Sequence, residues 1–85
     1  MPSREEVYAA INSERDYQDQ RWAGHRHEPE AWCLFMEYYL QLAREQASTK
    51  DFSNPTEVRK YMDIVRKVTT LGVACMEQHG APLRS

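Results

Sequence analysis

The sequence predicts an all-α fold, a short three-helix domain in which two long antiparallel helices carry most of the core. Three segments contain apolar residues at spacings of three and four, the pattern of amphipathic helices. Each segment lies between helix start and stop signals. The 85 residues leave room for one domain, 1–85, and a chain this short buries only about 60–65% of its unfolded surface. We therefore expect it to assemble as an oligomeric helical bundle of identical chains.

The first helix begins at the capping box Ser3-Arg4-Glu5-Glu6, in which Ser3 and Glu6 bond to each other's backbone N–H groups, and it runs to about Arg21. Five residues at helical spacing form its inward stripe: Val7, Ile11, Glu14, Gln18 and Trp22. The stripe turns polar halfway. A polar pair on a face that ought to be buried needs the donors of another helix, a ligand or a neighbouring subunit.

The second helix follows a loop over residues 22–29, where glycine, proline and alternating imidazoles leave no periodicity. Pro29 suits its first turn, and we expect it to end near Gln46. Six residues form its predicted core face: Trp32, Phe35, Met36, Tyr39, Leu42 and Ala43. Three further apolar residues fall partly outside that face: Leu34, Tyr38 and Leu40. A helix that is apolar on more than one face usually has two neighbours.

The third helix follows a polar connection over residues 47–54 and begins where Asn54 caps and Pro55 follows. It should end near Gln78, since Gly80 suits a left-handed cap and Pro82 cannot continue a helix. Its predicted inward stripe is Val58, Tyr61, Val65, Val68, Gly72 and Cys75, widened by Met62, Ile64, Leu71, Val73 and Met76. We interpret Gly72 as a close contact between helices, the alternative being a merely tolerated helix glycine.

The excess of apolar positions predicts where chains associate. Leu34 and Leu40 on the second helix, with Leu71 and Val73 on the third, exceed what one partner helix covers. We therefore expect oligomerisation through helices two and three, as a homo-oligomer.

The composition excludes several classes of function. A hydrophobic fraction of 41%, a charged fraction of 28% and a net charge of −2 are those of an ordinary folded protein, without the positive excess typical of proteins that bind duplex nucleic acid. Apolar runs are far shorter than the roughly 20 residues of a membrane span, and Met1 is followed by charged residues in place of a secretory signal. We expect a cytoplasmic protein that binds neither a membrane nor duplex nucleic acid.

The cysteines and histidines offer a possible metal site. Cys33 and Cys75 lie in apolar helical stretches, and two cysteines are too few for a disulfide framework, so we expect reduced, buried thiols. The alternative is a zinc site formed by His25, His27, Cys33 and His79. His-x-His alone lacks the paired spacings of structural zinc motifs, and we predict no metal site and no cofactor.

A resemblance covers most of the chain. Residues 14–22 read Glu-Arg-Asp-Tyr-Gln-Asp-Gln-Arg-Trp; a His-containing loop and Trp32 follow, and residues 73–77 read Val-Ala-Cys-Met-Glu. This pattern resembles small phage and bacterial proteins related to the MazG-like all-α nucleotide pyrophosphohydrolases. The resemblance implies a site built by helices of two or more subunits, in which a Glu-Glu-x-x-Glu run and a later Glu-x-x-Asp bind magnesium.

The sequence departs from that acidic pattern. The first run is here Glu37-Tyr38-Tyr39-Leu40-Gln41, and the second is Lys60-Tyr61-Met62-Asp63. Magnesium on a triphosphate needs several hard oxygen ligands, and Glu37 with Asp63 are too few. We therefore predict no catalytic residues and regard enzymatic activity as the less favoured interpretation.

The function that we expect is a non-catalytic nucleotide-binding oligomer. Guanidinium and ammonium groups hold phosphate, and aromatic rings stack on bases. The residues assigned to this ligand are Tyr17, Arg21, Trp22, Arg26, Arg66 and Lys67. For the basic residues of helix three, the alternative to phosphate binding is a solvent-exposed face on which Asp63 pairs with Arg59 or Lys67.

One role for such an oligomer is that of a phage anti-defence sponge, which sequesters a nucleotide second messenger such as a cyclic oligonucleotide or an ADP-ribose derivative. Two other functions stay open. One is a MazG-like nucleoside triphosphate pyrophosphohydrolase that uses Glu37 and Asp63, and the other is a structural or inhibitory helical adaptor whose aromatic residues are core.

Overall fold

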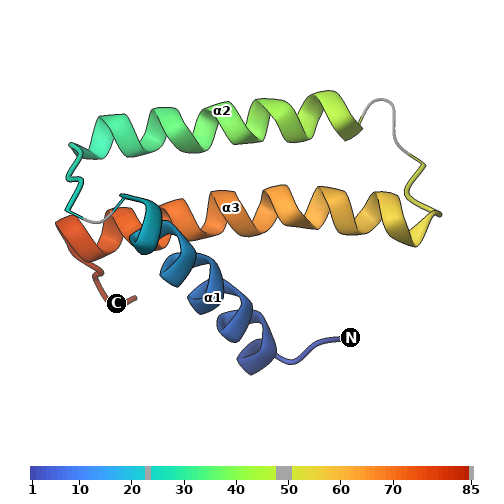
Figure 1. Ribbon diagram of the computed structural model, residues 1–85, viewed down its shortest axis with the longest axis horizontal. Coiled ribbons are helices and arrows are strands. Elements are labelled where there is room, and N and C mark those ends of the chain that lie inside the picture. The colour runs from blue at the N-terminus through green and yellow to red at the C-terminus, as the bar shows by residue number, and fades with distance from the viewer. Residues whose placement is uncertain (23, 48–50, 85) are drawn as a thin grey trace.

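Three helices make up the fold, in a computed structural model that describes residues 1–22, 24–47 and 51–84 (Figure 1). They are α1 (Arg4–Trp22), α2 (Pro29–Ala47) and α3 (Pro55–His79), and the described residues contain no strand. The predicted all-α class is confirmed, and each helix ends one residue beyond its predicted end. The middle of the predicted polar connection, residues 48–50, lies outside the described residues.

The helix ends form as local sequence signals predict. The Ser3 hydroxyl accepts a hydrogen bond from the Glu6 backbone N–H at 3.1 Å, and the Glu6 carboxylate accepts one from the Ser3 N–H at 3.3 Å. At the start of α3, the Asn54 side chain accepts from the Thr56 N–H at 2.9 Å. The cap after α3 differs from the prediction, because Gly80 has φ 117° and ψ 149°. This extended positive-φ conformation is open essentially to glycine alone and is not the left-handed helical one.

The core lies between α2 and α3 at the end of the molecule that carries the loop 24–28. Trp32, Leu71 and Ala74 are buried there, with Met36, Tyr39 and Cys75 packed against them. Ala43 and Ile64 are buried further along the same two helices. Burial of this apolar surface is the main stabilising term of the fold.

The inward face of α3 is rotated from the predicted stripe. Val65, placed at the centre of that stripe, is 41% exposed, whereas Ile64 and Leu71, placed at its edge, are buried. On α2 the predicted core residue Phe35 is also exposed. α3 is apolar over most of its circumference, so residue spacing did not determine which part faces α2.

Gly72 is not required for the packing against α2, and the prediction for the cysteines holds only in part. A Cβ atom added to Gly72 would meet only the Met36 Sδ, at 3.7 Å, which is ordinary van der Waals contact, so the packing against α2 does not require a glycine. The cysteines are free as expected, but Cys33 is exposed and Cys75 only half-buried.

The arrangement of the helices is open. α3 contacts both other helices, while no Cα atoms of α1 and α2 lie within 8 Å of one another in the described residues. Figure 1 shows α1 crossing α3 and α2 lying beside it. The accessible surface is 6825 Å², against about 5,200 Å² for a compact chain of 10 kDa. The radius of gyration is 14.2 Å, against about 12 Å for a compact chain of this length. α1 and α2 therefore diverge and leave a groove between them.

Candidate functional site

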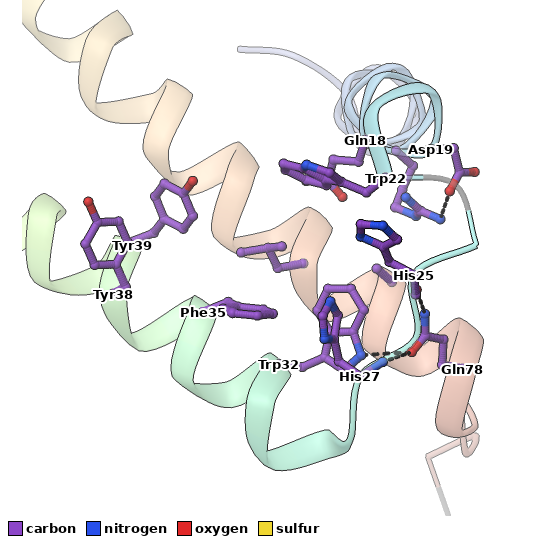
Figure 2. Close-up of a pocket in the computed structure, with 13 residues that line it drawn as sticks. Gln18, Asp19, Trp22, His25, His27, Trp32, Phe35, Tyr38, Tyr39 and Gln78 are labelled. Atoms are coloured by element: carbon purple, nitrogen blue, oxygen red, sulfur yellow. Dashed lines mark hydrogen bonds and ion pairs between the residues drawn. The ribbon is translucent and has the colours of Figure 1, made fainter.

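A groove of about 400 Å³ lies between α1 and α2, and α3 forms its floor (Figure 2). Arg15, Gln18, Asp19 and Trp22 line it from α1, and Trp32, Phe35, Tyr38 and Tyr39 from α2. The loop contributes His25 and His27, and the floor consists of Leu71, Ala74 and Gln78. Most of these side chains carry aromatic or imidazole rings, which present flat apolar surfaces with a polar edge. We call this cavity the aromatic groove.

Edge-to-face contacts order the α2 wall of the aromatic groove. The His27 ring centroid lies 5.1 Å from that of Trp32 and 5.0 Å from that of Phe35, with near-perpendicular planes. The Trp32 and Phe35 centroids are 5.9 Å apart, again edge to face. These distances are the favoured ones for aromatic pairs, so the wall has little freedom to collapse into the cavity.

Gln78 fastens the loop to the end of α3. Its amide oxygen accepts from the His27 backbone N–H and from the Trp32 Nε1–H, both at 3.1 Å, and its Nε2 donates to the His25 carbonyl at 2.9 Å. His79 adds a contact of 2.7 Å between its Nε2 and the His27 carbonyl. The sequence analysis missed Gln78. The available signal was Trp32, because a buried indole N–H requires an acceptor.

Gln18 differs from the other two buried polar residues of the described chain, Glu14 and Thr70, because they form hydrogen bonds and it forms none there. Only 4% of its surface is exposed, and its amide has no hydrogen bond to any described residue. It lines the aromatic groove, and Figure 2 shows it beside Trp22 on the α1 side. Buried amides are nearly always hydrogen-bonded in folded proteins. The sequence analysis predicted that the polar residues of the inward stripe of α1 need partners outside this helix. Gln18 has none within the described chain.

A second pocket of about 240 Å³ adjoins the aromatic groove and shares four lining residues with it: Gln18, Trp22, Tyr39 and Leu71. Tyr17, Arg21 and Lys67 also line this pocket, together with Glu14. Four of the six predicted ligand residues are thus gathered around one cavity, which we call the basic pocket.

Both cations of the basic pocket lie against aromatic rings. The Arg21 Nη1 donates to the Tyr17 hydroxyl at 3.1 Å, with the guanidinium carbon 5.6 Å from the centre of that ring. The Lys67 Nζ lies 5.7 Å from the centre of the Tyr39 ring. Neither cation has a carboxylate partner among the described residues. Both charges remain available to an anion.

The other two predicted ligand residues lie elsewhere. Arg26 is exposed and lines neither cavity. Arg66 donates from Nε to Glu14 and from Nη1 to Asp63, both at 2.8 Å. Asp63 thus pairs with Arg66, three residues on, rather than with Arg59 or Lys67. The hydrogen bond that Arg66 donates to Glu14 raises the pKa of Arg66, and burial opposes this rise. Arg66 neutralises a buried carboxylate and is not a free phosphate donor.

Arg15 forms the second ion-paired link between α1 and α3. Its guanidinium donates to both Glu77 carboxylate oxygens and, at 2.8 Å, to Asp19. The hydrogen bond to Glu77 is the main cause that raises the pKa of Arg15, and Asp19 adds to it against the opposing effect of burial. Arg15 therefore stays charged at any physiological pH and fixes α1 across the floor of the groove.

The two carboxylates that a magnesium site would use, Glu37 and Asp63, do not form a metal-binding group. Glu37 is exposed on α2, and Asp63 is engaged with Arg66. Within residues 1–22, 24–47 and 51–84, no three His, Cys, Asp or Glu side chains form a group that could hold a metal ion.

No helix in the described part of the chain combines the length and apolarity needed to cross a membrane. Comparison of the chain with protein-family models, with curated proteins and with solved structures found no match.

Proposed function

We propose that this protein binds a nucleotide, a ligand that joins a flat base to phosphate, and that it does not hydrolyse it. The observation that carries this proposal is Gln18, which is only 4% exposed, lines a groove of aromatic rings and makes no hydrogen bond within the described residues. Its amide atoms are not fully enclosed by the protein, so a ligand in the groove can hydrogen-bond to them.

The shape and chemistry of the aromatic groove suit a nucleobase. Its volume of about 400 Å³ falls within the range of small-ligand sites. Each base presents donors beside acceptors on an edge, and a glutamine amide supplies one of each side by side. Stacking on an aromatic ring contributes roughly 1–3 kcal/mol per base. Trp22, which is 44% exposed and lines both cavities, offers a stacking surface beside Gln18 (Figure 2).

The basic pocket suits the phosphate of the same ligand. Arg21 uses one of its five N–H donors on Tyr17, and the remaining donors with the Lys67 ammonium can hold phosphate oxygens. Glu14 lines this pocket, and its negative charge would repel phosphate if it were unpaired. The ion pair with Arg66 removes that obstacle. Arg66 thus supports the proposed site through Glu14 rather than by touching the ligand.

Hydrolysis would require more than this site supplies. Phosphoryl transfer depends on metal ions and on charges aimed at the reacting phosphate. Glu37 is exposed and Asp63 accepts from Arg66, so neither belongs to a carboxylate set of the kind that binds magnesium. A protein that binds a nucleotide without hydrolysing it can sequester that nucleotide, which is the role of a phage sponge for a nucleotide second messenger.

The proposed functional form is a homo-oligomer of antiparallel α2–α3 pairs. Its support is the accessible surface, 6825 Å² where a compact chain of this mass exposes about 5,200 Å².

The test of the ligand is a binding panel measured by isothermal titration calorimetry, with phosphorus NMR to detect breakdown. It compares nucleoside mono- and triphosphates, cyclic dinucleotides and ADP-ribose with ribose 5-phosphate, which has no base. Gln18→Met keeps the side-chain volume and removes the amide. We expect it to weaken binding about tenfold or more, because a lost ligand hydrogen bond of roughly 1.4 kcal/mol has that effect.

The thermal stability separates a ligand role from a structural one. Gln18→Met should leave the melting temperature unchanged or higher, since it replaces an amide that makes no hydrogen bond within the described fold by an apolar group of similar volume. The matched control is Arg26→Met, an exposed residue outside both cavities. No binding from the whole panel at millimolar concentration would overturn the proposal. Pyrophosphate release abolished by Glu37→Gln would establish the enzyme instead.

A further inference from the structure

The side of α3 that faces away from the groove carries a regular apolar seam. Its members are Val58, Met62, Val65, Thr69, Gly72 and Met76. Their spacings alternate four, three, four, three, four, which is the heptad repeat of a helix that packs along its length against one other helix. We call these six residues the α3 seam.

Four of the six members of the α3 seam are exposed, while Val58 and Gly72 are half-buried, Gly72 where it borders Met36 of α2. Met62, Val65 and Met76 are 48%, 41% and 46% exposed. α2 packs on another side of α3, where Ile64 and Leu71 are buried. α1 is attached on a third side through Glu14 to Arg66 and through Arg15 to Glu77.

Two members of the α3 seam, Thr69 and Gly72, have no unpaired polar group or bulky side chain that would oppose close packing. The Thr69 hydroxyl donates to the Val65 carbonyl of its own helix at 2.8 Å, so it needs no outside partner and leaves its methyl group to pack. Gly72 is not required by α2, since a Cβ atom there would have room. Gly72 lies at the edge of the seam, beside Met36 of α2, and adds no side chain that would keep a second helix at a distance.

We propose that the α3 seam pairs with the same seam of a second copy, as an antiparallel two-helix contact that gives a twofold symmetric dimer. The inference deepens the proposed homo-oligomer by naming its surface and does not depend on nucleotide binding. In antiparallel coiled coils, the two apolar positions of the heptad face each other in layers. A register centred on residue 67 matches all six members: Val58 faces Met76 of the second copy, Met62 faces Gly72, and Val65 faces Thr69.

Side-chain size selects this orientation. The long, adaptable Met62 side chain fills the space over Gly72 of the second copy. A parallel pair would place Gly72 against Gly72 and leave a void toward one end of the contact, where lost packing costs free energy.

Area and charge agree with such a dimer. A stable interface buries about 800 Å² on each partner, and this chain exposes roughly 1,600 Å² more than a compact one would. Arg66 flanks the proposed twofold axis, where the two copies' guanidinium groups approach each other. Each is already paired with Glu14 and Asp63, so their repulsion is reduced.

The test introduces opposite charges at residues 65 and 69, which face each other in the proposed register. Light scattering at micromolar concentration then measures the mass, and circular dichroism measures the helix content. Wild-type protein should have twice the chain mass of 10.0 kDa. Val65→Glu and Thr69→Lys, each alone, should give the monomer with unchanged helix content. The double variant Val65→Glu/Thr69→Lys should regain the dimer, because each new carboxylate then faces a new ammonium on the other copy.

The matched control is Leu34→Glu, which puts the same charge on an exposed apolar residue of α2 outside the seam and should stay dimeric. A monomeric wild-type protein overturns the proposal, and so does a Val65→Glu variant that remains a dimer. Dissociation by Leu34→Glu alone would move the interface to α2. If both single variants dissociate and the double variant does not recover, the antiparallel register is wrong.

Discussion

The two contacts that hold α3 in place are of opposite kinds. Against α2 it buries Trp32, Leu71 and Ala74, an apolar surface that excludes water. Against α1 it relies on two ion-paired clusters, one centred on Arg15 and one on Arg66. Apolar burial is strong and little affected by salt. Exposed ion pairs contribute roughly 0–1 kcal/mol each and are screened by salt, while the Arg66–Glu14 pair, whose carboxylate is buried, is screened less.

This difference divides the groove into a fixed wall and an adjustable one. The α2 wall belongs to the apolar core and is ordered further by the rings around His27. The α1 wall carries Gln18 and Trp22 and depends on directional polar contacts. A ligand that adds hydrogen bonds and stacking to the α1 side would therefore stabilise the less secure half of the site.

The largest expected effect comes from breaking the apolar contact. Trp32→Ala removes a side chain that is only 7% exposed, and truncation of such a residue costs about 3–5 kcal/mol. Much of the stability of a domain this small would be lost. Urea denaturation followed by circular dichroism measures it. Leu34→Ala, on the same helix but 63% exposed, should change the unfolding free energy by less than about 0.5 kcal/mol. Equal effects of the two variants would mean that Trp32 is not the core.

The next largest effect is expected from the hydrogen bonds by which Gln78 holds the loop 24–28 against α2 and α3. Gln78→Met keeps the volume but removes three hydrogen bonds and leaves the Trp32 Nε1–H without its acceptor. We expect a loss of about 2–3 kcal/mol, at roughly 1 kcal/mol per bond. Gln41→Met is the matched control, because Gln41 is exposed and bonds only weakly, at 3.4 Å, to Glu45. Chemical denaturation of both variants compares them, and a Gln78→Met variant as stable as the control would show that the loop is held by packing alone.

Local signals explain why the helix ends could be predicted from sequence. The cap at Ser3 and the cap at Asn54 each involve residues two or three positions apart, so the sequence contains both partners. Gly80 was recognised as a stop for the same reason, although its ψ of 149° is not that of the expected cap. The rotation of α3 escaped prediction, because a helix apolar on several faces gives no preference for Ile64 over Val65.

In the candidate site too, residues with local sequence signals could be predicted, and contacts between distant residues could not. Gln18 could be singled out from sequence, because it breaks an apolar stripe at helical spacing, and Tyr17, Arg21 and Trp22 lie close to it on α1. The pairing of Arg66 with Glu14 could not be predicted, since Glu14 is 52 residues away in the chain and helix pairing rules cover only neighbours three or four positions apart, such as its other partner Asp63. Gln78 was missed for the same reason, as its contacts span 46 to 53 residues.

The smallest expected effect tests the adjustable wall through salt. Raising the ionic strength to 1 M shortens the screening length to about 3 Å, which weakens the ion pairs of α1 and leaves the apolar contact of α2 intact. We expect the backbone amides of α1 to exchange with deuterium about twofold to fivefold faster, corresponding to a loss of roughly 0.5–1 kcal/mol, while those of the α2–α3 core change little.

The sign of the pH dependence makes salt the better probe. The pKa values of Arg15 and Arg66 are raised above the ordinary value for arginine, so their stabilising contribution is fully present below that ordinary value and is lost only as the pH rises through the raised pKa. Between pH 6 and about 9 these charges do not change, and exchange can be measured there without titrating them. Arg15→Met should reproduce part of the salt effect at low salt, and Arg59→Met, on the exposed side of α3, should not. If all three helices respond equally to salt, the ion pairs do not distinguish α1 from the rest, and the groove has two fixed walls.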